Sequence, residues 1–131
     1  MKNVVQAAVR WTLVVAYLAL IFVLSSRQRL PVPAVAIPGF DKVVHCAVYA
    51  VLAVFIVRAA SSTWGPERAT RLWPLVAVTA FGLLYGITDE MHQGWIPGRT
   101  ASGWDLVADA VGSAGGSFLG RLMVRSSGLL G

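Results

Sequence analysis

An acidic residue, a histidine and a tyrosine follow one another at four-residue spacing in the first half of this 131-residue chain. Asp41, His45 and Tyr49 would form a polar stripe along one face of a helix, because residues four apart are neighbours on a helix surface. A carboxylate, an imidazole and a phenol in one line suit acid–base chemistry. Asp41 by itself is also explained as a helix N-cap, so its role stays open between a cap and a functional acid.

Two adjacent acids end a later apolar run. Asp89 and Glu90 fall where a helix C-terminus would carry partial negative charge, so the macrodipole disfavours both carboxylates there. A nearby cation, a metal ion or protonation of one acid must offset this cost. His92 and Gln93 follow within one helical turn of Asp89 and add further hydrogen-bonding groups. The pattern indicates a functional cluster and not a cap.

An arginine follows this cluster after a turn signal. Pro97-Gly98 predicts a turn that brings Arg99 back towards the acids. Arginine pairs with both carboxylate and phosphate through its planar fork of donors. We therefore expect either a structural ion pair to Asp89 or Glu90, or a phosphate-binding arginine.

Two aspartates lie on the last apolar run. Ser102 and Asp105 have the spacing of a capping box, which leaves a structural role for Asp105 open. Asp109 lies one turn deeper, where no cap explains it. An ionisable residue inside a membrane span is by default a functional hypothesis, and its expected partners are His45, Arg99 or Lys42.

The elements that must position these residues are long apolar runs. Hydrophobic residues make up 56% of the chain and charged residues 13%, whereas soluble domains average about 25% charged residues. A span needs about 20 apolar residues. We predict one all-α integral membrane domain over residues 1–131, a bundle of four transmembrane helices near residues 4–25, 42–60, 72–91 and 104–123. Three prolines between Gln28 and Phe40 predict an extended loop there.

The charges predict an orientation in the membrane. With four spans, the two termini and the middle loop share one side, which holds seven basic residues: Lys2, Arg10, Arg58, Arg68, Arg71, Arg121 and Arg125. The other side holds four: Arg27, Arg29, Lys42 and Arg99. The positive-inside rule then places both termini in the cytoplasm and the motif-bearing loops outside. Every acid except Glu67, and both histidines, fall at the outward end.

Small residues recur at four-residue spacing in the last two runs, at Gly82 and Gly86 and at Gly112, Gly116 and Gly120. Such spacing lets helices approach closely in lipid. We expect these faces to pack within the bundle, with an oligomer formed through them as the alternative.

Together these motifs resemble the VanZ-like family of polytopic membrane proteins. The first signature is Asp41-Lys42-x-x-His45-x-x-x-Tyr49, and the second comprises Asp89-Glu90-x-His92-Gln93, Pro97-Gly98-Arg99 and Asp105-x-x-x-Asp109-x-x-Gly112. The resemblance covers about residues 20–120. This chain departs from it at Asp109, where the family often has asparagine. The family is named for a teicoplanin-resistance protein, so the resemblance implies a link to glycopeptide resistance but no settled reaction.

We expect the outward cluster to bind or modify a phosphorylated or glycosylated envelope lipid at the cell membrane. The candidate catalytic residues are Asp41, His45, Asp89, Glu90 and His92. The candidate substrate-binding residues are Lys42, Tyr49, Gln93, Arg99, Asp105 and Asp109. The expected partners are membrane lipids. The net charge of +5 is scattered and forms no basic stripe, so nucleic acid is not expected. Whether the protein is an enzyme stays open.

Three alternatives remain. A metal site has suitable ligands, but Glu90-x-His92 is not the H-E-x-x-H spacing, so we expect no metal and no cofactor. A structural membrane module would use the cluster as an ion-pair lock. A small transporter would depend on Asp109, because the first apolar run, from Val4 to Leu24, contains no acid.

Overall fold

The computed structural model of the protein describes residues 2–27 and 38–129. This part of the chain is all-α, with no strand among its residues. Four long helices and one short one follow each other in the order α1 (Lys2–Ser25), α2 (Phe40–Trp64), α3 (Pro66–Ala69), α4 (Leu72–Gln93) and α5 (Gly103–Leu129). The predicted all-α class is therefore confirmed.

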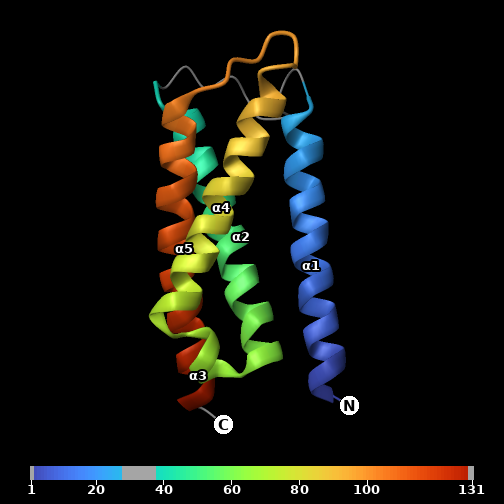
Figure 1. The fold of residues 1–131 in the computed structure, drawn as a ribbon, viewed down its shortest axis with the longest axis vertical. Coiled ribbons are helices and arrows are strands. Elements are labelled where there is room, and N and C mark those ends of the chain that lie inside the picture. Colours follow the sequence, from blue (N-terminus) through green and yellow to red (C-terminus); the bar gives the residue numbers. More distant parts are fainter. Residues whose placement is uncertain (1, 28–37, 130–131) are drawn as a thin grey trace.

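The long helices run lengthwise beside one another as a bundle (Figure 1). α2 packs most extensively on α5 and also contacts α1, while α4 packs mainly on α5. The start of α1 and the end of α5 lie at one end of the bundle, together with α3 (Figure 1). The connection from α4 to α5 lies at the opposite end, which we call the loop end. Residues distant in sequence therefore meet there.

Glycine and proline set several helix boundaries. Gly39 has φ 80° directly before α2, and Gly65 has φ 86° between α2 and α3. Both values are left-handed backbone that glycine adopts without a Cβ clash. Pro66 then occupies the first position of α3, where a missing N–H costs no helical hydrogen bond.

The helix ranges differ from the predicted ones mainly at their ends. α2 continues to Trp64, past the predicted end near residue 60, and α5 continues to Leu129, past residue 123. The short α3 was not predicted, because Gly65-Pro66 reads as a turn from sequence alone. Most of the predicted extended loop, residues 28–37, lies outside the described residues.

Three helices are long and apolar enough to cross a membrane: Val4–Ser25, Phe40–Trp64 and Leu72–Gln93. Among the described residues α5 does not reach the same standard, so the prediction of four spans is met only in part. α5 is less apolar because Asp105, Asp109 and several glycines and serines interrupt its sequence. Four of its polar residues are buried within the bundle: Asp105, Asp109, Ser113 and Ser117.

Glycines bring the helices of the bundle close together. A Cβ on Gly112 would overlap the carbonyl oxygen of Cys46, and one on Gly116 would overlap that of Ala50. Both contacts are with the backbone of α2. On α4, a Cβ on Gly82 would overlap the Ser113 hydroxyl. The predicted small-residue faces thus pack inside one chain, while an oligomer formed through them stays a prediction.

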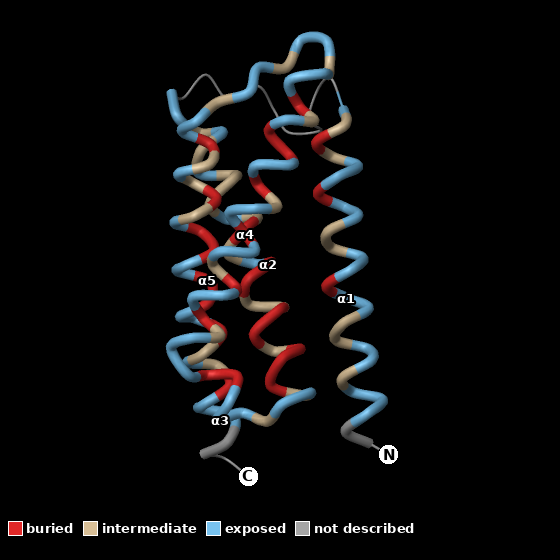
Figure 2. Tube along the Cα trace, viewed as in Figure 1, coloured by how far each residue is buried: buried red, intermediate tan, exposed pale blue. Residues whose placement is uncertain are grey.

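The outside of the bundle is largely apolar. Large apolar residues are exposed on several helices, including Val5 and Val15 on α1, Leu84 on α4 and Phe118 on α5. Figure 2 shows that much of α1 is exposed. The buried core centres on α2, where Tyr49, Leu52 and Val57 are each 1% exposed. An apolar exterior on this scale suits a lipid environment better than water.

Candidate functional site

Polar residues of α2 and α5 face each other at the loop end. The Lys42 ammonium lies 2.6 Å from one carboxylate oxygen of Asp105. One turn deeper, His45 Nδ1 lies 3.0 Å from Asp109 Oδ1. His45 Nε2 lies 4.0 Å from the second Asp105 oxygen. The side chains of His45, Asp105 and Asp109 are 15%, 7% and 0% exposed, so this cluster is largely shielded from the surroundings.

The hydrogen bond to Asp109 determines which nitrogen of His45 is free. With Asp109 ionised and His45 neutral, the His45 Nδ1–H donates to Asp109, because a carboxylate can only accept hydrogen bonds. Nε2 then keeps its lone pair and faces Asp105 and the rest of the cluster. An imidazole held in this way can accept a proton or ligate a cation.

The predicted acids at the end of α4 are buried, and each has a partner. Glu90 Oε2 accepts a hydrogen bond from the Ser102 backbone N–H at 2.7 Å. Asp89 Oδ2 accepts one from Gln93 Nε2 at 2.8 Å, and Gln93 Oε1 accepts one from Arg99 at 2.6 Å. The donors that offset the two carboxylates thus come from the α4–α5 loop and from Gln93. Within the described residues Arg99 forms no direct ion pair with Asp89 or Glu90, so it reaches the acids through Gln93.

The capping-box interpretation of Asp105 is wrong. In a capping box the Asp105 carboxylate would accept the Ser102 N–H, but Glu90 accepts it instead. Only the backbone N–H of Asp105 contacts the Ser102 carbonyl, at 3.0 Å. The carboxylate of Asp105 is therefore directed at Lys42 and His45.

Asp41 does not cap α2. Gly39 occupies the N-cap position with no side-chain cap, and Asp41 lies in the first helical turn. Its carboxylate pairs with the neighbouring Lys42 at 2.6 Å and is 60% exposed. Asp41 is thus at the rim of the cluster, with Lys42 between it and Asp105.

The two histidines contact different helices. His92 Nε2 lies 2.9 Å from the Ser26 hydroxyl, and its ring stacks on Phe22 with 4.8 Å between ring centroids. Phe22 lies in the last turn of α1, and Ser26 follows directly after this helix. His45 contacts α5 instead, so the structure joins His45, and not His92, to the carboxylates of α5.

A buried polar stripe on α5 extends the site into the bundle. Asp105, Asp109, Ser113 and Ser117 follow one another at four-residue spacing, and each is at most 5% exposed. Within the described residues, Asp109 Oδ2 and the hydroxyls of Ser113 and Ser117 have no hydrogen-bond partner. The same holds for the buried Tyr49 hydroxyl. The two serines were not predicted, although their spacing from Asp109 was visible in the sequence.

Three residues of the cluster are close enough to hold a metal ion. One ligand atom from each of His45, Glu90 and Asp105 lies within 4.8 Å of the other two. These residues come from α2, α4 and α5, so no local sequence motif contains them.

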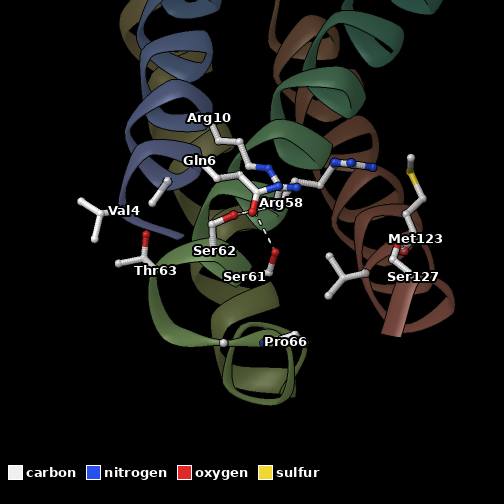
Figure 3. Close-up of a pocket in the computed structure, with 13 residues that line it drawn as sticks. Val4, Gln6, Arg10, Arg58, Ser61, Ser62, Thr63, Pro66, Met123 and Ser127 are labelled. Carbon is white, nitrogen blue, oxygen red and sulfur yellow. Dashed lines mark hydrogen bonds between the residues drawn. The ribbon is translucent and has the colours of Figure 1, made fainter. Parts of the chain in front are cut away.

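A separate cavity of about 750 Å³ lies near α3, at the other end of the bundle (Figure 3). Arg10 and Arg58 line it, and Arg10 donates a hydrogen bond to the Arg58 carbonyl at 3.0 Å. None of the predicted site residues lines this cavity. It is therefore distinct from the loop-end cluster.

The comparisons with known proteins agree with the resemblance seen in the motifs. No curated protein and no solved structure matches the chain. The family described as VanZ/LLP1 matches residues 3–124, nearly the whole chain, and thus includes all the residues of the loop-end cluster. The chain belongs to the VanZ-like family.

Proposed function

We propose that this protein spans the cell membrane four times and binds, at its outward-facing loop end, the phosphorylated or glycosylated head group of an envelope lipid. The bound head group would be positioned by Lys42 and Arg99, and His45 would act on it as a general base. The observation that carries the proposal is the His45–Asp109 pair, which holds a free imidazole nitrogen within a cluster that also contains Lys42.

Tryptophans support a membrane position for all four long helices. Trp95 and Trp104 flank the α4–α5 connection and are 77% and 73% exposed. Trp64 and Trp73 flank α3 at the other end and are 56% and 79% exposed. Tryptophan is enriched at both membrane–water interfaces. Two such belts, one at each end of the bundle, favour α5 as a fourth span whose polar side faces its neighbours.

The common end of the termini supports the proposed orientation. α1 begins and α5 ends at the same end of the bundle as α3 (Figure 1), and most of the basic residues belong to this end in the sequence. By the positive-inside rule this is the cytoplasmic end. The loop-end cluster would then meet lipids of the outer leaflet.

Two cations at the rim of the cluster are placed to meet a phosphate group. Lys42 is 33% exposed and Arg99 is half-buried, so both cations are within reach of a ligand at the surface. His45 Nε2 can take a proton from a hydroxyl or water that attacks the head group, because Asp109 holds the ring through Nδ1. A link to teicoplanin resistance is implied by the family resemblance and stays a prediction.

The second candidate function is a structural lock without catalysis. The Ser102–Glu90 and Lys42–Asp105 contacts tie the α4–α5 loop to α4, and α2 to α5. Such a lock would be the main role of the cluster if neutralising its charges unfolded the protein. The test below separates the two functions.

The test is lipid retention by the purified full chain in mild detergent, measured by native mass spectrometry. We expect the wild type to retain an anionic lipid and Arg99→Ala to lose it, because the guanidinium would no longer be available to phosphate. Arg68→Ala is the matched control, since Arg68 is exposed on α3, at the other end of the bundle.

Thermal melting of each variant shows whether it is folded. A folded Arg99→Ala protein that retains the same lipid as the wild type would contradict the proposal. An Arg99→Ala protein that no longer folds would favour the structural lock. The identity of a retained lipid would name the substrate class.

A further inference from the structure

The loop-end cluster contains more buried carboxyl groups than lysines or arginines that pair with them. Glu90, Asp105 and Asp109 are 5%, 5% and 0% exposed. Among the lysines and arginines that the structure describes, only Lys42 pairs directly with one of these carboxyl groups. Buried charges are normally paired or coordinate a metal, because desolvation of an unpaired charge is costly. A phosphate group would add further negative charge, which a cation bound in the cluster would offset.

Three ligand atoms surround the place where such a partner would lie. One atom each from His45, Glu90 and Asp105 lies within 4.8 Å of the other two. Asp105 directs one oxygen at Lys42, and its other oxygen is 4.0 Å from His45 Nε2. Glu90 uses Oε2 for the Ser102 N–H, while its buried Oε1 has no hydrogen-bond partner among the described residues.

A second layer of contacts orients each of these three groups. Asp109 holds His45 through Nδ1 at 3.0 Å, Lys42 holds Asp105 at 2.6 Å, and the Ser102 N–H holds Glu90 at 2.7 Å. A histidine that ligates a metal almost always donates its other ring N–H to a carboxylate, a carbonyl or water. The Asp109–His45 pair has this arrangement, with Nε2 left for a cation.

We propose that His45 Nε2, one Glu90 oxygen and one Asp105 oxygen bind a single divalent cation. One nitrogen and two carboxylate oxygens suit manganese or zinc better than magnesium or calcium, which prefer oxygen alone. Three protein ligands leave coordination positions open to water or to a substrate oxygen. Cation binding stands on this geometry alone. A cation on Nε2 takes up the lone pair that would otherwise act as a general base, so these two roles of His45 are alternatives. A role of the cation in bridging a lipid phosphate rests on the lipid binding proposed above.

The first measurement is a titration of the metal-free full chain, in detergent, with Mn²⁺. Electron paramagnetic resonance reports free Mn²⁺, and we expect one ion bound per chain. Pulsed measurements on the bound ion should show coupling to one imidazole ¹⁴N. This signature needs no variant, so it tests the site even where a substitution prevents folding.

Matched variants identify the ligands. The chain has two histidines, and we expect His45→Ala to remove the nitrogen coupling while His92→Ala leaves it unchanged. Glu90→Gln should weaken Mn²⁺ binding beyond the ~10–100-fold that follows loss of an outer-layer partner. Its control is Glu67→Gln on the exposed α3, which should bind like the wild type. Thermal melting confirms that each variant is folded.

Three results would overturn the inference: no saturable Mn²⁺ binding, bound Mn²⁺ without nitrogen coupling, or nitrogen coupling that depends on His92. Each can be told apart from failure of the proposed function. A wild type that retains lipid but binds no Mn²⁺ refutes the metal site and leaves lipid binding standing. A wild type that binds Mn²⁺ through His45 but retains no lipid supports the metal site and refutes the proposed lipid binding.

Discussion

At the scale of single residues, the geometry of the site depends on His45, which lies between two aspartates of α5. Its Nδ1 contacts Asp109, and its Nε2 faces Asp105 at 4.0 Å. Asp109 itself needs room, which Gly86 provides: a Cβ on Gly86 would lie 2.5 Å from Asp109 Oδ2. The orientation of the imidazole therefore depends on a buried carboxylate and on a glycine of a third helix.

Asp109→Asn tests this orientation at constant side-chain shape. An amide can still accept from the His45 Nδ1–H, but it no longer supplies the negative charge that raises the basicity of the ring. We expect Mn²⁺ affinity to fall about 10–100-fold with one ion still bound per chain, as measured by the same titration.

The control for Asp109→Asn is Ser117→Ala, two turns further along the same buried stripe, which should bind Mn²⁺ like the wild type. Equal affinity for Asp109→Asn and wild type would show that Asp109 does not support a ligand through His45.

At the scale of elements, the close contact of α2 with α5 places His45 opposite Asp105 and Asp109. Gly112 and Gly116 pack directly on the backbone of α2 at Cys46 and Ala50. Backbone atoms cannot move aside as the end of a flexible side chain can. The separation of these two helices is therefore sensitive to any side chain at the glycine positions.

Gly116→Ala and the adjacent Gly115→Ala form a matched pair. A Cβ on Gly116 would overlap the Ala50 carbonyl, whereas one on Gly115 has nothing within 4 Å. We expect Gly116→Ala to lower the free energy of unfolding by about 1–3 kcal/mol through overpacking. Gly115→Ala should leave it unchanged or raise it by up to about 1 kcal/mol, because alanine favours helix.

Unfolding of both glycine variants would be followed in detergent by circular dichroism. Equal stability of the two would mean that the α2–α5 approach has more freedom than the glycine contacts indicate.

At the scale of the whole molecule, the two ends of the bundle differ in chemistry. The loop end holds the cluster of Lys42, His45, Glu90, Asp105 and Asp109, whereas the other end has the cavity lined by Arg10 and Arg58 (Figure 3). An even number of spans would keep both termini on one side of the membrane. The proposed function requires the loop end to face outward.

Cysteine labelling tests this orientation. In a Cys46→Ala background, which removes the native cysteine, Thr100→Cys would report the α4–α5 loop and Glu67→Cys would report α3, both at exposed positions. We expect a membrane-impermeant maleimide to label Thr100→Cys on intact cells and Glu67→Cys only after permeabilisation. The reverse pattern would place the cluster in the cytoplasm, and labelling of both on intact cells would contradict an even number of spans.

Much of the fold was predictable because its signals are local. Apolar runs bounded by glycine and proline predict helices wherever backbone hydrogen bonds must be satisfied without water, and the four long helices overlap the predicted ranges. Asp105 and Asp109, which the sequence places one helical turn apart, are both buried on α5. The short α3 was not predicted because Gly65-Pro66 is also a turn signal, and the burial of Ser113 and Ser117 was not predicted because composition does not show what a neighbouring helix covers.

The sequence by itself determined the helical class, the VanZ-like motifs and the set of polar residues that gather near one end. Only the tertiary structure decided how they pair: Lys42 with Asp105, His45 with Asp109, and Glu90 with the Ser102 N–H. Spacing along one helix specifies which residues share a face, but not which face of another helix they meet. That choice depends on how closely α2 and α5 approach through their glycines, and it brings His45, Glu90 and Asp105 together from three helices.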